Sequence, residues 1–117
     1  MKDFTKFLIR INSDIKDLDN LKKYFYNELR LIHMNQINDS TLDVTAKDAI
    51  VNIFEEYSFK NKCDITVVQY DKSFNYIKKF NVSNGNIDRK NFKSFDKDLI
   101  LSEYEIYKEL EKLLNNN

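Results

Sequence analysis

The chain has 117 residues, with 19 basic and 19 acidic side chains and a formal net charge of zero. This length suits one domain with a single core, and the balanced charge gives no overall attraction to nucleic acid or to an anionic membrane. The single cysteine excludes an internal disulfide, and no apolar run approaches the length of a membrane span. Because charged residues interrupt segment 1–12, we expect no signal peptide and a cytoplasmic protein.

Amino-acid usage indicates an A/T-rich coding sequence. The chain is rich in Lys, Asn, Ile, Phe and Tyr, has one Gly and lacks Pro. The enriched residues have A/T-rich codons and the depleted ones have G/C-rich codons, so we expect a low-GC bacterium, its phages or plasmids, or an A/T-rich protist as the source. The abundance of aromatic and Asn residues therefore carries little functional information.

The first third of the chain has the spacing of an amphipathic helix. Apolar residues recur at alternating steps of four and three, and an N-cap within the pattern is offered by Asn12-Ser13-Asp14 and another by Asp17 or Asp19. We therefore predict two helices, over about 4–11 and 14–35. In an alternative interpretation, residues 5–11 form an added β-strand, because apolar side chains also alternate there. The apolar positions of the helical pattern are Phe4, Leu8, Ile11, Ile15, Leu18, Phe25, Leu29 and Ile32.

Three consecutive aromatic residues lie in the second predicted helix. Successive helical residues point about 100° apart, so Tyr24, Phe25 and Tyr26 cannot all meet one core. One interpretation is that a tyrosine contacts a partner protein or a second copy of the chain. The other is a central helix covered on two sides, with its phenol groups reaching solvent.

A shorter helix is predicted over about 45–59. Thr45 offers an N-cap and Asp48 a carboxylate at the third helical position, where it meets the positive end of the helix. The predicted apolar face consists of Ala49, Ile50, Ile53, Phe54 and Tyr57.

A three-stranded antiparallel meander is predicted over about 64–93. The β-branched and aromatic run 65–70 favours a strand, segment 76–82 carries the return strand, and Asn84-Gly85 suits a two-residue hairpin turn. The register of the first hairpin stays open, because two loop lengths after Tyr70 are both acceptable.

The Asn84-Gly85 turn fixes an expected register for the second hairpin. It pairs Val82 with Ile87, Phe80 with Arg89, Lys79 with Lys90 and Ile77 with Phe92. Side chains alternate along a strand, so one face becomes the core face and carries Lys78 and Arg89 as well. The apolar members of this face are Tyr76, Phe80, Val82 and Ile87.

A final helix is predicted over about 102–114. Ser102 and Glu105 match a capping box. The sequence as a whole thus predicts an α+β domain spanning 1–117, in which the meander packs against three to four helices. The inward stripe expected for the final helix comprises Ile100, Tyr104, Tyr107, Leu110 and Leu114.

Charge is unevenly distributed along the chain. Residues 63–95 include six basic and three acidic residues, and residues 96–117 include three basic and six acidic residues. The basic meander is a candidate nucleic-acid surface, and the acidic helix is a candidate docking surface for a basic partner. A solvated sheet face and a solvated helix face explain the same patterns. The residues concerned are Lys78, Lys79, Arg89, Lys90 and Lys93 in the meander and Glu103, Glu105 and Glu109 in the helix.

Catalytic motifs are weak. Cys63 and His33 are each unique but nothing in the sequence places them together, and a closed zinc site lacks soft ligands. Asp88 has the acid-x-Lys spacing of metal-dependent nucleases, with Asp71 or Glu55 available as a second acid, but such a short match has poor specificity.

The leading hypothesis is a non-enzymatic module that binds another protein, without metal or cofactor. Its most concrete form is a small phage or plasmid protein that inhibits a host system such as a defence nuclease. The candidate partner-binding residues are Tyr24, Tyr26, Glu103, Glu105 and Glu109. The alternatives are a nucleic-acid-binding protein that uses the basic meander and a metal-dependent nuclease.

Overall fold

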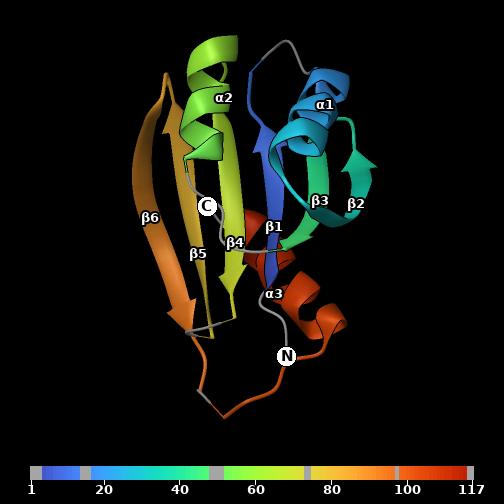
Figure 1. Ribbon diagram of the computed structural model, residues 1–117. Helices are drawn as coiled ribbons and strands as arrows, with labels where there is room; N and C mark the ends of the chain where they lie inside the picture. Colours follow the sequence, from blue (N-terminus) through green and yellow to red (C-terminus); the bar gives the residue numbers. More distant parts are fainter. Residues whose placement is uncertain (1–3, 14–16, 48–51, 73–74, 97, 116–117) are drawn as a thin grey trace.

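The computed structural model describes residues 4–13, 17–47, 52–72, 75–96 and 98–115, with only the backbone described at 89–92. Within these residues the protein is an α+β domain whose single sheet lies between two helix layers (Figure 1). The strands are β1 (Phe4–Ile11), β2 (Leu31–Asn38), β3 (Thr41–Lys47), β4 (Ile65–Asp71), β5 (Tyr76–Ser83) and β6 (Asn86–Ser94), and the helices are α1 (Leu18–Glu28), α2 (Ile53–Asn61) and α3 (Glu103–Asn115).

The sheet has six described strands in the order β2-β3-β1-β4-β5-β6, and every neighbouring pair is antiparallel. In Figure 1, α1 and α2 lie on one face and α3 lies on the other. The order and connectivity from β1 to β4 are those of the ferredoxin-like βαββαβ motif. The β5–β6 hairpin and α3 extend this unit, so the predicted meander forms one half of a larger sheet.

β1 is the central strand, and the prediction of a helix over 4–11 is wrong. Its side chains are buried on both sides of the sheet, with Phe7 and Ile9 facing α1 and α2 and Leu8 facing α3. A strand buried on both faces has apolar residues at consecutive positions, so the steps of four and three between Phe4, Leu8 and Ile11 arose without a helix. The alternative strand interpretation of 5–11 is correct.

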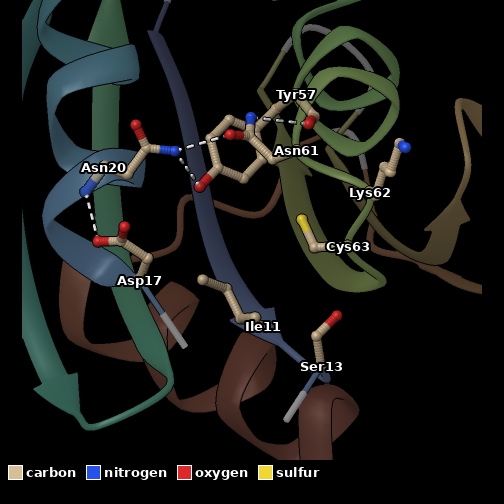
Figure 2. A pocket seen from close by; sticks show the side chains of 8 residues that line it. All are labelled: Ile11, Ser13, Asp17, Asn20, Tyr57, Asn61, Lys62 and Cys63. Carbon is tan, nitrogen blue, oxygen red and sulfur yellow. Dashed lines mark hydrogen bonds between the residues drawn. The ribbon is translucent and has the colours of Figure 1, made fainter. Parts of the chain in front are cut away.

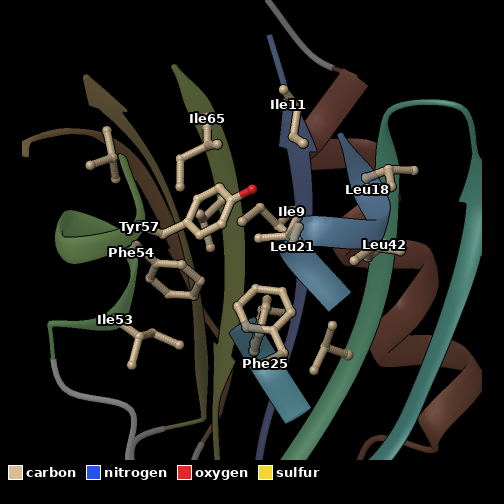
Figure 3. Packing of buried hydrophobic residues seen from close by; sticks show 14 of the residues in the cluster. Ile9, Ile11, Leu18, Leu21, Phe25, Leu42, Ile53, Phe54, Tyr57 and Ile65 are labelled. Carbon is tan, nitrogen blue, oxygen red and sulfur yellow. The ribbon is translucent and has the colours of Figure 1, made fainter. Parts of the chain in front are cut away.

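The larger core lies between the sheet and the α1–α2 layer (Figure 3). The Phe7 ring packs edge-on against Phe25 of α1, with centroids 5.5 Å apart, and against Phe54 of α2, at 5.1 Å. Offset and edge-to-face aromatic pairs add to the stabilisation from apolar burial. These contacts fix both helices over the central strand.

The smaller core lies between the sheet and α3. Ile106, Leu110 and Leu114 of α3 are buried against Leu8, Val68 and other sheet residues. The predicted inward stripe of this helix is partly wrong, because Ile100 and Tyr104 are exposed. Ser102 and Glu105 do form the predicted capping box through two reciprocal hydrogen bonds of 3.1 Å.

The predicted helix over 14–35 is shorter than expected. α1 begins after Asp17, whose carboxylate accepts a 3.0 Å hydrogen bond from the backbone amide of Asn20. The prediction of Asp17 as an N-cap is therefore confirmed. The helix ends at Glu28, and β2 follows after two residues. Leu31 and Met34 contact the larger core from this strand, whereas Ile32 of the predicted helical stripe is exposed. The helical spacing therefore failed at β2.

The predicted helix over 45–59 is wrong at 45–47, and residues 48–51, with Ala49 and Ile50 of its predicted apolar face, lie outside the described residues. Thr45 and Ala46 belong to β3, which pairs with β1, and α2 occupies Ile53–Asn61. Sheet pairing on both sides therefore outweighed the capping signal at Thr45. Asp48 lies outside the described residues.

The meander prediction is confirmed, and Gly85 lies at the expected reversal. Asn84 and Gly85 have φ values of 49° and 82°, as a two-residue hairpin turn requires. A Cβ added at Gly85 would lie 3.2 Å from the Cβ of Phe59. The turn therefore needs glycine for its φ angle and for its close approach to α2.

The expected register of the second hairpin holds only near the turn. Val82 pairs with Ile87 and Phe80 pairs with the backbone of Arg89, as predicted. An irregularity between Lys79 and Phe80 then shifts the register, so Lys79 pairs with Asn91 instead of Lys90 and Ile77 pairs with Lys93 instead of Phe92. On the predicted core face, Phe80 and Val82 are buried, Tyr76 is half-buried and Ile87 is exposed.

A buried ion pair joins β1 to β3 on the α3 side of the sheet. Lys6 Nζ lies 3.0 Å from Asp43 Oδ1 and donates a weaker 3.5 Å hydrogen bond to Thr45 Oγ1, and both charged side chains are about nine-tenths buried. Each charge is stabilised by the other, because neither has access to bulk water.

We predict that Asp43→Ala lowers the free energy of unfolding by about 3–5 kcal/mol, because the Lys6 charge stays buried without its partner. The double variant Lys6→Met/Asp43→Leu should match the wild type or exceed it in stability, because no charge is then buried. Equilibrium urea unfolding of the three proteins measures both effects. A loss below about 1 kcal/mol for Asp43→Ala would contradict the interpretation.

Candidate functional site

A cleft of about 380 Å³ opens between the start of α1 and the end of α2 (Figure 2). Its size is within the range of small-molecule sites. The residues that line it come from β1, α1, α2 and the loops beside them, and they are Ile11, Ser13, Asp17, Asn20, Tyr57, Asn61, Lys62 and Cys63.

Several polar groups of the cleft are used to hold these elements together. Asn20 Nδ2, in the side chain, donates to Tyr57 Oη at 3.2 Å and to Asn61 Oδ1 at 2.9 Å. Asn61 Nδ2 donates to the Tyr57 backbone carbonyl at 3.0 Å. Ser13 Oγ accepts from the Asp64 amide at 2.9 Å. These bonds connect α1, α2 and the start of β4.

The titratable groups with shifted pKa values in the cleft are held in their protonated forms. Burial raises the pKa of the Cys63 thiol above its ordinary value, and Asp64 raises it further. Burial also raises the pKa of the Tyr57 hydroxyl. Activation of a cysteine nucleophile requires the opposite shift, toward the thiolate at neutral pH. The cleft is therefore better suited to structural connection than to nucleophilic chemistry.

The structure does not bring the sequence-derived catalytic candidates together. His33 is exposed on β2, whereas Cys63 precedes β4, and β3 and β1 lie between these strands. Asp88 pairs with Asn81 near the Gly85 turn, and Asp71 lies at the opposite end of β4. Across the described part of the chain, no group of three His, Cys, Asp or Glu residues is placed to hold a metal ion.

The basic residues proposed for nucleic-acid binding do not form one face. Lys78 lies on the α2 side of the sheet, where its Nζ is 5.6 Å from the centroid of the Phe80 ring. Lys79 lies on the α3 side, where its Nζ donates to the Leu113 carbonyl at 3.2 Å. Lys93 forms a 2.8 Å ion pair with Glu109. The side chains of Arg89 and Lys90 lie outside the described residues.

The two candidate tyrosines of α1 differ in environment. The Tyr24 ring packs against Tyr57, and its hydroxyl donates to the Ile53 carbonyl at 2.9 Å, so this side chain joins α1 to α2. Burial and the nearby carboxylate of Glu56 raise the pKa of Tyr24. Tyr26 is exposed, which leaves it as the tyrosine able to meet a partner.

The three candidate glutamates of α3 also separate. Glu109 pairs with Lys93, and this hydrogen bond lowers its pKa. Glu105 closes the capping box with Ser102, although its side chain stays exposed. Glu103 is exposed in the first turn of α3. The acidic surface available to a partner is therefore concentrated at the start of the helix.

An exposed apolar segment lies next to this acidic surface. Leu99 and Ile100 precede α3 and Tyr104 lies in its first turn, with 48%, 91% and 68% of their surfaces exposed. We call these three residues the α3 projection. In Figure 1 the connection between β6 and α3 extends beyond the end of the sheet. The projection is therefore accessible to another molecule.

Asn75 anchors the connection that carries the projection. Its amide nitrogen donates to the Asp96 carbonyl at 2.6 Å and to the Leu99 carbonyl at 3.0 Å, while its Oδ1 accepts from Tyr70 at 2.7 Å. Phe95 and Leu101, on either side, pack against the smaller core. The apolar side chains of the projection are thus presented from a fixed backbone.

Acidic residues flank the projection in sequence, while Lys108 Nζ lies 5.6 Å from the centroid of the Tyr104 ring. Asp96, Asp98, Glu103 and Glu105 are all exposed and lie within a few residues of Ile100. Sequence analysis identified the glutamates but assigned Ile100 and Tyr104 to the core. For Ile100 the signal is the capping box at Ser102, because residues before an N-cap have no helical phase.

Comparisons of the chain with models of protein families, with curated proteins and with solved structures found no match. Within the described ranges, no helix combines the length and apolar character needed to cross a bilayer.

We predict that Asn75→Gly increases the amide hydrogen-exchange rates of residues 98–102 and lowers the free energy of unfolding by about 1–3 kcal/mol. Glycine accepts the positive φ of Asn75, 50°, so the loss reflects the side-chain hydrogen bonds. Asn84→Gly is the matched control, because Asn84 has a φ of 49° at a solvent-exposed turn. Equal amide hydrogen-exchange rates at residues 98–102 in the two variants would contradict the anchoring role of Asn75.

We predict that alkylation of Cys63 by iodoacetamide accelerates only above the ordinary thiol pKa of about 8.5, because the thiolate is the reacting form. The measurement is the alkylation rate as a function of pH. A Cys63→Ser/Asp39→Cys variant, with its thiol at an exposed turn, provides the comparison. A midpoint for Cys63 at or below that of the comparison would show that burial does not suppress the thiolate.

Proposed function

We propose that the protein is a non-enzymatic module that binds another protein through the α3 projection. The observation that carries the proposal is the 91% exposure of Ile100 on a backbone segment that Asn75 and two packed neighbours hold in place. A large aliphatic side chain at this exposure contributes nothing to the core and favours association when a partner covers it.

Holding the backbone of the projection in place favours a high affinity for the partner. Binding a mobile loop costs conformational entropy for each residue that becomes ordered. Here Asn75 contacts both ends of the turn from Asp96 to Leu99, whose own 3.0 Å hydrogen bond closes it. Part of the ordering cost is therefore met during folding, and the contact energy of Ile100 is available for binding.

The acidic surroundings define the chemistry of the partner. Asp98, Glu103 and Glu105 favour a protein with an apolar pocket surrounded by basic residues, because complementary charges accelerate encounter and disfavour other partners. Enzymes that act on nucleic acid have basic surfaces of this kind. We therefore propose a nuclease of a host defence system as the target and a phage or plasmid as the source, a view that the A/T-rich coding bias supports.

Nucleic-acid binding receives less support. Two of its five candidate residues, Lys79 and Lys93, contact α3, and Lys78 lies on the other face of the sheet. The three described side chains therefore do not form the single basic groove that tracks a nucleic-acid backbone.

We predict that Ile100→Asp weakens partner binding by about tenfold or more, since burial of such a side chain contributes about 1.5–3 kcal/mol. The partner is first isolated from source cells with the wild-type protein, and its affinity for the purified variants is then measured by calorimetry. Ile100→Asp should fold normally, because the side chain it replaces is almost fully exposed.

Tyr26→Asp is the matched control, since Tyr26 is also an exposed apolar residue but lies on α1. The proposal requires that Tyr26→Asp binds like the wild type and that the affinity of the wild type falls with added salt. Equal binding by Ile100→Asp and the wild type would overturn it, as would an isolation in which the wild type and Ile100→Asp retain the same proteins.

A further inference from the structure

The turn between β5 and β6 contains an Asn-Gly pair, and Gly85 is the single glycine of the chain. Asn84 is exposed, and its side-chain amide makes no hydrogen bond with the residues that the structure describes. The backbone nitrogen of a glycine is open to a neighbouring side-chain amide, because glycine has no Cβ to hinder the approach. The turn is therefore a candidate site of covalent modification.

The backbone conformation of the turn controls the distance between the two reacting groups. Asn84 and Gly85 have φ values of 49° and 82°, which are typical of a type I′ turn. A type II′ turn differs by a flip of the peptide group between the two central residues, and its first ψ is about −120°. At that ψ the Cβ of Asn84 eclipses the Gly85 nitrogen, so the side-chain carbonyl carbon Cγ can contact this nitrogen. One peptide flip therefore brings the reacting atoms together.

The fold allows this flip. Type I′ and type II′ turns are the two favoured connections of two-residue hairpins, so the pairing of Val82 with Ile87 is kept. Gly85 accepts the negative φ of the flipped turn as readily as its present positive φ. The flip breaks a long hydrogen bond of 3.4 Å from the Gly85 amide to Ser58 Oγ. The conformation that permits reaction is therefore accessible without unfolding.

Two other exposed asparagines show what distinguishes Asn84. The side-chain oxygen of Asn38 accepts hydrogen bonds of 2.9 and 3.1 Å from Ser40, which hold the amide in place. Asn86 is exposed in the same hairpin as Asn84, but it belongs to β6 and is followed by Ile87. The β-branched side chain of Ile87 crowds its own backbone nitrogen. Asn84 combines a free side chain with an unhindered neighbour.

We propose that Asn84 deamidates in the folded protein through a cyclic imide formed with Gly85. Solvent hydroxide removes the proton of the Gly85 nitrogen, which then attacks Asn84 Cγ and closes a ring through a new C–N bond. The side-chain nitrogen takes a proton from water and leaves as ammonia. Water then opens the ring at one of two bonds. Cleavage between the Gly85 nitrogen and Cγ gives aspartate, and cleavage between this nitrogen and the backbone carbonyl carbon gives isoaspartate. One water is consumed for each ammonia released, and no atom changes its oxidation state.

The two products differ in their effect on the hairpin. Aspartate accepts a positive φ as asparagine does, so the turn keeps its geometry and gains one negative charge. Isoaspartate lengthens the backbone of the turn by one methylene group, which disturbs the pairing of Val82 with Ile87 and the contact of Gly85 with Phe59. The turn lies at the opposite end of the sheet from the α3 projection, so this inference does not rest on the proposed binding function (Figure 1).

The test incubates the full chain at mildly alkaline pH and follows each asparagine by mass spectrometry of its peptides. Asn84 should convert first. Its rate in the folded chain should lie within about tenfold of its rate in guanidinium, because one flip between favoured turns is the conformational step. Asn84→Gln should abolish the early release of ammonia, because the longer side chain closes its ring more slowly. Asn86→Gln is the matched control in the same hairpin and should release ammonia like the wild type.

Conversion of Asn84 in guanidinium but not in the folded chain would overturn the proposal, because the turn would then protect the amide. Faster conversion of Asn86 or Asn38 in the folded chain would overturn it too. The two products are then separated by chromatography and unfolded in urea. The aspartate form should match the wild type in its unfolding midpoint, and the isoaspartate form should unfold at a lower urea concentration. Equal midpoints for the isoaspartate form and the wild type would contradict the expected disturbance of the hairpin.

Discussion

The structure depends on the burial of β1 on both of its faces. Phe7 and Ile9 support α1 and α2 on one side, and Leu8 contributes to the core under α3 on the other. A strand in this position must be apolar at consecutive residues and can have charge only where a partner compensates it, as Asp43 does for Lys6. The two helix layers, and the extension of the sheet in both directions, follow from this one strand.

The same constraint explains which parts of the fold could be predicted from the sequence. The meander was recognised because Val67 and Phe80 belong to β-rich segments and Gly85 marks the reversal. Asp17 and Ser102 were recognised because N-caps are local hydrogen bonds. β2 and β3 were missed, and β1 was recognised only as the alternative strand over 5–11, because strand pairing is not local and an apolar spacing of three or four also occurs in a strand that is buried on both faces.

The candidate site shows where periodicity fails. Ile100 fits an apolar stripe only if the helix already includes it, but α3 begins at Glu103, after the Ser102 cap. Its true environment is set by Asn75, which lies far away in sequence and reaches the Leu99 carbonyl across the fold. No local pattern predicts such a bond, so the glutamates at the start of α3 could be identified and the exposure of Ile100 just before them could not.

Each exposed apolar residue needs its own explanation, because the amino-acid composition of this chain is strongly biased. Phe59 is exposed but packs against the Gly85 turn, so its position has a structural reason. Ile100 has no comparable contact, yet the backbone on either side is fixed by Asn75 and by packed neighbours. Ordering a segment that displays an apolar side chain costs entropy and solubility, and under the proposed binding function a bound partner would compensate both. Anchoring, and not exposure alone, therefore distinguishes a binding surface from the effect of biased composition.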